Sequence, residues 1–501
     1  MPAIPQSRFA HWTFLAAVAV YLCTAWCSTG FHAADEQYQV IAFAEARAAH
    51  APRDPLPWEY GAQIRSAFLP VAGMAVFAAA RALGMHDPFL LAFLLRALTA
   101  LLALWALRRF TRGMLPLLPQ SLGPPFLLLS YFLWFLPFLL VRFTGETWSG
   151  LLILAALAPM PAPQHASRPF LQSGLLLGLA FLCRPPTAAI ALGLVGWLVA
   201  VKQEARSRTA LLLAAMVATV LAGMALDAWF YRQPVATAWN YLRMGVAGNA
   251  DHPFTEFPWW YYYAWVVKYA IPVFGIPILA AFGLLCAFRP RHFLVWAIVP
   301  FLVMHMLLPH KDLRFLYPLA PLMPLLLIAA LPAAALHMPR LFGLLARPAL
   351  RNTLLACAAA VNLLALSVVV SSPAGSGRTR LAQHIRQHYP EQPVRINYLS
   401  DEPSVWAIRI PRFYLPPNAT DSLVGDACGP LQSVHGGAEL LVADKQPGPC
   451  PMAARQWVPV ERALPRWKEI ALRAYDLEDV RPVWRLYQSN PAPTPGLPSA
   501  P

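Results

Sequence analysis

Two short clusters of charged residues stand out in a sequence that is otherwise apolar. Asp35 and Glu36 follow the first hydrophobic segment, and the run HKDLRF at residues 310–315 separates two late hydrophobic segments. Charged side chains beside hydrocarbon are costly and usually have a function. A carboxylate in one cluster, with an ammonium and a guanidinium in the other, could deprotonate a hydroxyl group and bind a phosphate.

Each cluster also has a purely structural explanation. A helix is predicted from Asp35 through Glu45, with Tyr38 and Ile41 on one face, as in an amphipathic segment lying on a membrane surface. An acidic residue at its N-terminus would cap this helix and stabilise it by about 1 kcal/mol. The later cluster could be an ordinary turn whose basic side chains reach the headgroups. Four titratable residues within five positions, in a chain so poor in charge, favour a functional explanation there.

The composition is typical of a polytopic membrane protein. Of the 501 residues, 58% are hydrophobic and 13% are charged, about half the share of roughly 25% in soluble proteins. The mean hydropathy is +0.48. The net charge of +15 comes from basic residues scattered between apolar segments. This pattern predicts cytoplasmic loops and excludes a nucleic-acid-binding surface.

The apolar segments predict about eleven to thirteen membrane-spanning helices, since each crossing needs about 20 residues. The long run at 170–200 should contain two helices, broken at Pro185-Pro186. Basic loops predicted to be cytoplasmic lie at 108–112, 202–208, 289–292 and 340–351. The opposite face should then carry the segments 31–62, 231–261 and 309–314 and the chain after residue 371. Between residues 62 and 112, one apolar run must be re-entrant, interfacial or tilted, because the number of crossings and the basic loops disagree there.

The chain is predicted to divide into three parts. Residues 1–372 form the transmembrane domain, with a catalytic loop at 31–62 and a second loop at 309–318. Residues 373–490 predict a small α/β domain outside the membrane, with a helix at 379–388 and short strands at 394–398, 440–442 and 483–486. Residues 491–501 are rich in proline and alanine, which predicts disorder. Cys428 and Cys450 could pair in an oxidising compartment.

Five segments with polar or charged residues follow one another along the hydrophobic part of the chain. They are DEQYQ at 35–39 with WEY at 58–60 and IRS at 64–66, RFTGE at 142–146, RPPTAA at 184–189, the run 240–262, and HKDLRFLYP at 310–318. In this order they resemble glycosyltransferase family 22, the mannosyltransferases that use polyprenyl-phosphate-mannose to build GPI anchors and N-glycan precursors. The sequence departs from the family pattern at Asp312, where Glu is usual, at Phe143, and at the Pro-Pro doublet after Arg184.

The resemblance implies a fold of the GT-C type for the all-α polytopic membrane part. The small extracytoplasmic α/β domain is predicted from the residue pattern alone, because the chain after residue 375 resembles nothing in the family. The resemblance also implies an inverting transfer of mannose from the lipid phosphate to a hydroxyl group of a glycan or glycolipid. Asp35 would be the general base, and Glu36 could orient it or share its task. Lys311 and Arg314 would bind the donor phosphate and stabilise the charge that grows on it, so no general acid is required. His310 could donate one more hydrogen bond to the phosphate.

Other residues would support the site. Trp58 would stack on the sugar, and Glu59 would bind its hydroxyl groups. We expect a further set of residues to form a buried charge network or to contact the basic groups. They are Arg65, Arg142, Glu146, Arg184 and Asp312. The aromatic run 259–261 is more typical of an interfacial belt than of a sugar platform. No cofactor is expected, and a metal requirement stays open because no ligand cluster predicts one.

Two other functions remain open at this stage. A transporter or flippase of lipid-linked sugars could use the same charged cavity, although the inverted halves typical of transporters are not visible in the sequence. An assembly subunit could use the charged loops to dock a partner. Within the enzyme hypothesis, another polyprenyl-phosphate sugar could replace mannose. Short loops and a composition rich in proline, alanine and arginine favour a bacterial inner membrane with a periplasmic active site over an ER membrane with a lumenal one.

Overall fold

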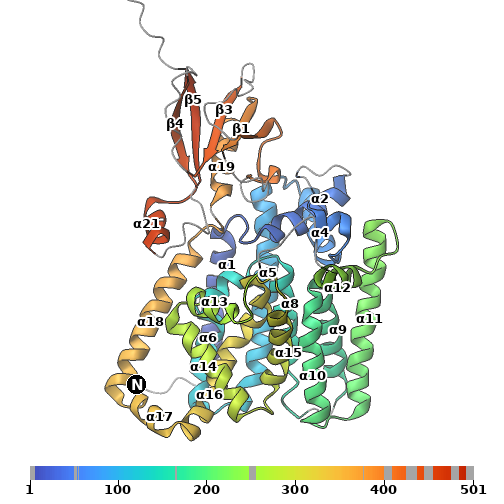
Figure 1. Ribbon diagram of the computed structural model, residues 1–501, viewed down its shortest axis with the longest axis vertical. Helices are drawn as coiled ribbons and strands as arrows, with labels where there is room; N and C mark the ends of the chain where they lie inside the picture. Colours follow the sequence, from blue (N-terminus) through green and yellow to red (C-terminus); the bar gives the residue numbers. More distant parts are fainter. Residues whose placement is uncertain are drawn as a thin grey trace, which may run out of the picture.

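The computed structural model describes residues 6–49, 54, 56–163, 166–247, 256–375, 377–399, 409–424, 437–444, 455–474 and 484–491. Figure 1 shows a bundle of helices with a small sheet above one end. This arrangement confirms the predicted fold class, a helical membrane protein with a small C-terminal α/β part.

In the part of the chain that the structure describes, five helices are long and apolar enough to cross a membrane. They are α1 (Gln6–Cys27), α5 (Pro88–Met114), α11 (Arg206–Tyr231), α18 (Pro348–Val370), and the continuous pair η5 (Leu313–Leu322) with α16 (Met323–His337). A sixth candidate span consists of α14 (Pro272–Phe288) and α15 (Phe293–Leu307), which are bent by 112°. The protein is therefore a multi-pass membrane protein.

Four apolar helices are too short to count as spans by length alone. They are α4 (Phe68–Ala82), α8 (Gly145–Leu157), α9 (Arg168–Cys183), and the pair η4 (Pro185–Thr187) with α10 (Ala188–Ala200). The chain leaves α9 at Arg184 in an extended conformation, so the predicted break at Pro185-Pro186 is confirmed. Among the described residues, length and composition therefore give five candidate spans, or six with the bent pair, fewer than the eleven to thirteen that the sequence predicts.

Short helices connect the longer ones. They are η2 (Leu115–Leu117), η3 (Gln120–Leu122), α6 (Gly123–Phe132), α7 (Phe135–Leu140), α12 (Thr237–Ala247), α13 (Tyr261–Tyr269) and α17 (Pro339–Leu345). In Figure 1, α17 and the connection between α10 and α11 lie at the lower end of the bundle, opposite the sheet. These segments carry two of the basic loops that the sequence predicts to be cytoplasmic.

The helix predicted after Asp35 is present, as η1 (Glu36–Ile41), a π-helix, followed by α2 (Ala42–Ala49). Its predicted position on the membrane surface is wrong. Every residue from 36 to 45 is buried, so the helix has no exposed polar face. The reason is that α4 and the C-terminal domain pack around it.

The stretch between residues 62 and 112, where the predicted number of crossings and the basic loops disagree, contains the two apolar helices α4 and α5. Figure 1 shows α4 beside α2 at the upper end of the bundle, while α5 runs down through it. The buried residues of α4 recur every three to four positions on one face, and the helix has only 15 residues. Of the two helices, only α5 is long enough to count as a candidate span.

The C-terminal sheet has five strands in the order β2-β1-β3-β5-β4. Their bounds are β1 (Val394–Leu399), β2 (Ala419–Val424), β3 (Ala438–Ala443), β4 (Arg455–Arg462) and β5 (Arg485–Pro491). β1 pairs in parallel with β2 and β3, and β5 pairs antiparallel with β3 and β4. Three helices accompany the sheet, α19 (Arg378–His388), η6 (Arg412–Tyr414) and α21 (Arg466–Ala474).

The predicted helix at 379–388 and the strands at 394–398 and 440–442 are confirmed. The last predicted strand begins two residues later than expected, at Arg485. β2 and β4 were not expected, because their sequences lack a continuous apolar run. Cys428, Cys450 and the predicted disordered tail beyond residue 491 lie outside the described residues.

Candidate active site

Asp35 lies directly before η1, in the position of a helix cap, but its side chain makes no capping hydrogen bond. The capping explanation of this residue is therefore wrong. Its Oδ2 instead lies 2.7 Å from Nη1 of Arg314 and 3.8 Å from Nη2 of Arg65. The carboxylate of the first loop and the guanidinium of the late cluster thus meet across the molecule.

The position of Arg314 is fixed by Asp312, one of the residues that depart from the family pattern. Asp312 is the N-cap of η5, and its Oδ1 accepts a hydrogen bond from the backbone N–H of Arg314 at 3.0 Å. The other carboxylate oxygen lies 2.7 Å from Nε of Arg314. The short aspartate side chain therefore caps the helix and orients the guanidinium at the same time.

Close packing against α8 fixes the position of η5. A Cβ atom at Gly150 would lie 2.9 Å from Cα and O of Pro318, so only glycine allows this approach. Pro318 lies one turn beyond Arg314 on η5. The backbone of α8 therefore sets how far Arg314 reaches toward Asp35.

The charges around Asp35 control its ionisation. Burial alone would raise the pKa of the Asp35 carboxyl, but Arg314 and Arg65 outweigh that effect and hold the pKa below its usual range. In the unliganded protein Asp35 is therefore ionised and paired with Arg314 rather than poised as a free base.

Glu36 faces the opposite direction from Asp35. Its Oε1 lies 3.5 Å from Nη1 of Arg142, and its Oε2 accepts a hydrogen bond from the backbone N–H of His32 at 3.1 Å. Arg142 also donates to the backbone carbonyls of Ser28 at 2.7 Å and Gly30 at 3.1 Å. Glu36 and Arg142 therefore form a buried pair that fixes the start of the loop.

A third ion pair lies on the far side of Asp35. Oε1 of Glu146 is 3.0 Å from Nη1 of Arg184, and both side chains are buried. The Arg184 guanidinium also lies over the ring of Phe315, 4.7 Å from its centre. A cleft lies between this pair and Asp35. Its polar lining consists of Asp35, Gln39, Arg65, Ser66, Thr144, Glu146 and Arg184.

Glu59 borders the same region. It lies in α3 (Trp58–Ala62), and its Oε1 accepts a hydrogen bond from Nε2 of Gln39 at 2.8 Å. Burial raises the pKa of the Glu59 carboxyl. Trp58 begins the same helix and is half-buried. Gln39 lines the cleft beside Asp35. It belongs to the DEQYQ segment, but the sequence did not predict it as a site residue.

His310 and Lys311 lie in the turn that precedes η5. Nζ of Lys311 donates to the Leu308 carbonyl O at 2.5 Å, within its own loop. Burial lowers the pKa of this lysine. The backbone of His310 forms an isolated antiparallel bridge with Glu256, and its ring meets that of Phe315 edge-on. Of the basic groups predicted to bind phosphate, only Arg314 is paired with Asp35 by a salt bridge among the described residues.

Asp227 is a buried residue that sequence reasoning missed. Its Oδ1 accepts hydrogen bonds from the backbone N–H of Ala67 at 2.7 Å and the hydroxyl of Ser66 at 2.9 Å. Its Oδ2 accepts one from the hydroxyl of Thr237 at 2.7 Å. Asp227 thereby joins α11, α12 and the segment that carries Arg65. A lone aspartate in an apolar run was the available sequence signal.

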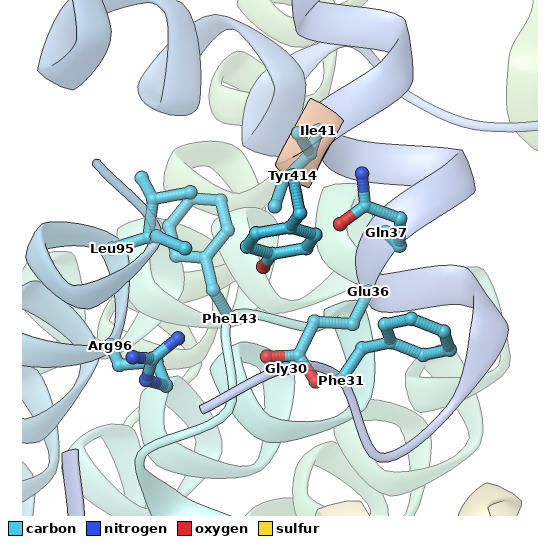
Figure 2. Close-up of a pocket in the computed structure, with 10 residues that line it drawn as sticks. Gly30, Phe31, Glu36, Gln37, Ile41, Leu95, Arg96, Phe143 and Tyr414 are labelled. Carbon is cyan, nitrogen blue, oxygen red and sulfur yellow. The ribbon is translucent and has the colours of Figure 1, made fainter. Parts of the chain in front are cut away.

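A second, smaller pocket lies on the Glu36 side of the loop. Figure 2 shows the ring of Tyr414, from η6 of the C-terminal domain, with its hydroxyl directed between Arg96 and Glu36. The C-terminal domain therefore reaches into the transmembrane part beside the candidate site. No group of three or more histidine, cysteine, aspartate or glutamate side chains suited to a metal ion occurs among the described residues.

Comparison with known proteins identifies the family. The model of the Alg9-like mannosyltransferase family matches residues 12–380. The chain belongs to this family. The matched part contains Asp35, Arg314 and the rest of the cleft, whereas all five strands of the C-terminal sheet lie beyond it.

Curated relatives are similar over part of the chain. GPI mannosyltransferase 3 of Yarrowia lipolytica is 27% identical over 275 residues, which cover 54% of this chain and 52% of the relative. GPI alpha-1,2-mannosyltransferase 3 of Danio rerio is 25% identical over 273 residues, with 53% and 49% covered. The chain thus spans about half the length of the curated relatives it matches.

A solved structure shows the same fold. ArnT from Cupriavidus metallidurans, bound to undecaprenyl phosphate, superposes with a TM-score of 0.55 at 14% sequence identity. The match covers 95% of this chain and 97% of ArnT, so it includes the C-terminal sheet. At this identity the likeness establishes the fold and leaves the substrate open.

Proposed function

We propose that this protein is a membrane mannosyltransferase that uses a polyprenyl-phosphate-mannose donor and a hydroxyl group of a glycan or glycolipid as acceptor. The observation that carries the proposal is the 2.7 Å pairing of Asp35 with Arg314 beside a polar cleft. The membership of the Alg9-like mannosyltransferase family supports the sugar, and the undecaprenyl phosphate bound to the ArnT structure supports a lipid-phosphate donor.

In the proposed reaction, Asp35 removes the proton from the acceptor hydroxyl. The acceptor oxygen attacks the anomeric carbon, and the bond from that carbon to the phosphate oxygen breaks, which inverts the configuration. The polyprenyl phosphate leaves with the negative charge, which Arg314 stabilises. Lys311 and His310 extend the phosphate site from the preceding turn, and Glu59 and Trp58 border the sugar.

The donor phosphate would also activate the base. A phosphate that binds Arg314 competes with Asp35 for the same guanidinium. Because Arg314 lowers the pKa of Asp35, its engagement by phosphate raises the basicity of the carboxylate. The paired state seen here is then the resting state, and the donor binds before the acceptor is deprotonated.

The proposed location is the inner membrane of a bacterium, with the cleft facing the periplasm. The basic loops at the lower end of the bundle support a cytoplasmic assignment of that end. The sheet and the cleft would then face the opposite compartment. The lumenal side of the ER is the alternative, which the eukaryotic origin of the curated relatives supports.

The decisive experiment measures transfer from polyprenyl-phosphate-mannose by the full chain in lipid nanodiscs. The change Asp35→Asn keeps the shape of the side chain and removes the base, so we expect kcat to fall by at least about a hundredfold. Asp87→Asn is a matched control, because Asp87 only caps α5 by accepting the N–H of Leu90 at 2.9 Å. Full activity of Asp35→Asn would exclude this carboxylate as the base.

Polyprenyl-phosphate pentoses and other hexoses should be tested beside mannose. Transfer of one of these sugars in place of mannose would keep the reaction and change the substrate. If lipid-linked sugar crosses the membrane of a proteoliposome without any transfer, the protein is a flippase and the enzymatic proposal fails.

A further inference from the structure

The segment that carries Asp35 is contacted by the C-terminal domain where the segment begins. The backbone N–H of Ala374 donates to the carbonyl of Thr29 at 2.8 Å. Gly375 lies so close to the carbonyl O of Phe31 that a Cβ atom would come within 2.6 Å of it. The guanidinium of Arg378 lies over the Phe31 ring, 5.4 Å from its centre.

A second contact lies at the other end of the same segment. Oδ1 of Asp54 accepts a hydrogen bond from the backbone N–H of Arg412 at 2.7 Å, and Oδ2 accepts one from Phe413 at 3.4 Å. Asp54 is 4% exposed. A buried carboxylate that accepts two backbone N–H groups makes strong, charge-assisted hydrogen bonds. This pair ties the loop to η6.

The two aromatic residues of η6 anchor it on the transmembrane part. Phe413 stacks on Phe77 of α4 with ring centres 5.9 Å apart, and Tyr414 meets Phe89 of α5 at 5.2 Å. Both are 2% exposed. The same hydrophobic cluster contains Val40 of η1 and residues of α4, α5 and the C-terminal domain. The domain is therefore packed into the transmembrane core.

We propose that the C-terminal domain is a positioning element of the active site, and that Asp54 and Tyr414 are its positioning residues. This inference rests on the proposed function, because it concerns the placement of Asp35. From the bundle side, Arg142 fixes Ser28, Gly30 and Glu36. His32 also contacts the hydroxyl of Tyr317 on η5 at 2.9 Å. The C-terminal domain adds restraints at Thr29 and Asp54, on either side of Asp35. Neither partner of Asp54 in η6 lies within the residues that the family model matches.

The placement of Asp35 then depends on the domain, whereas the donor site on η5 does not. Asp54→Ala removes both acceptors and should lower kcat about tenfold, since small misplacements of a catalytic group cost one to two orders of magnitude. The donor KM should change by less than about twofold because Arg314 stays on η5. Asp54→Asn keeps one carbonyl oxygen for the Arg412 N–H and should restore kcat to within about threefold of wild type.

Tyr414→Phe provides a milder variant, which removes a single hydroxyl beside Glu36 and Arg96. It should lower kcat about threefold with the donor KM unchanged. Glu461→Gln is the matched control, because Glu461 pairs with Arg380 and His384, which both lie inside the C-terminal domain. It should keep the wild-type kcat.

A measurement that does not depend on catalysis distinguishes the positioning role of the C-terminal domain from the proposed mannosyltransferase function. Amide hydrogen exchange of residues 29–49 should be at least about tenfold faster in Asp54→Ala than in wild type and Glu461→Gln, since the loop opens locally more often. Faster exchange supports the positioning role even if no sugar donor is used and the proposed function fails. Unchanged exchange, or a donor KM that rises together with a fall in kcat in every variant, overturns the inference.

Discussion

Asp35 is an acid whose properties are set by its neighbours. Its carboxylate lies between Arg314 and Arg65, with the closer contact at 2.7 Å. Each guanidinium favours the ionised form, and together they outweigh the effect of burial on the pKa. The free enzyme should therefore keep this base ionised into the acid range. The acid limb of its pH profile should depend on the positive charges of the two arginines.

Arg65→Gln tests this directly. Loss of one positive charge raises the pKa of Asp35, so the acid limb of kcat/KM, which reports the free enzyme, should move to higher pH. Measurement of kcat/KM from acidic to neutral pH gives the limb for each variant. Arg81→Gln, an exposed arginine on α4, should leave the limb where it is. A limb that stays in place in Arg65→Gln would show that this charge does not act on the base.

The two basic residues predicted to bind phosphate should contribute unequally. Arg314 points at Asp35, whereas Nζ of Lys311 donates to Leu308 in its own loop. Arg314→Gln should raise the donor KM and lower kcat by about a hundredfold in kcat/KM, as loss of a charged transition-state contact does. Lys311→Ala should cost about tenfold or less, because Lys311 must first leave its present acceptor. Steady-state kinetics with varied donor compare them, and a larger loss in Lys311→Ala would reverse the assignment.

At the scale of elements, the site depends on how closely helices approach. α8 reaches η5 only because residue 150 is a glycine. Gly150→Ala should push η5 away, destabilise the protein by about 1–3 kcal/mol and lower activity through Arg314. Gly283→Ala on α14 is the control, since a Cβ atom there has nothing within 4 Å. Thermal unfolding in detergent and transfer assays measure both effects, and equal behaviour of the two variants would contradict this account.

Hydrophobic patterning predicted most of these elements but not how deeply each is buried in the protein. The break at Pro185-Pro186, the helix after Asp35 and strand β1 follow from proline chemistry and apolar periodicity. The burial of η1 could not be predicted, because α4 and η6, which cover it, are distant in sequence. For the same reason, Asp54 and Asp227 looked like ordinary loop and span residues. Their partners are backbone amides and hydroxyls that carry no sequence signal.

At the scale of the whole molecule, the arrangement divides the chain into two ends. The sheet lies at one end, and α17 and the connection between α10 and α11 lie at the other (Figure 1). A cysteine at Gly61, which is exposed with open space around its Cβ position, should react with an impermeant maleimide from the outside of intact cells. A cysteine at the exposed Arg291, between α14 and α15, should react only after permeabilisation.

These cysteines are placed in a background without the native ones, and full transfer activity is the control for correct folding. Labelling of both positions from one side would contradict the topology on which the location of the cleft depends. Labelling of Arg291→Cys alone from outside would invert the orientation. The positive-inside rule could predict the overall orientation from sequence, but the bounds of α4, and with them its short length, follow only from the structure.

The ion pairs at the start of the π-helix η1 limit how the length of this segment can change in evolution. Asp35 and Glu36 are neighbours in sequence but belong to separate ion pairs, one with Arg314 and the other with Arg142. A one-residue shift of this segment would bring one of the two carboxylates to the position of the other, and the second ion pair would lose its carboxylate. Alignments of homologous chains should therefore be free of gaps across residues 30–41, while length variation should collect in the connections of the C-terminal sheet.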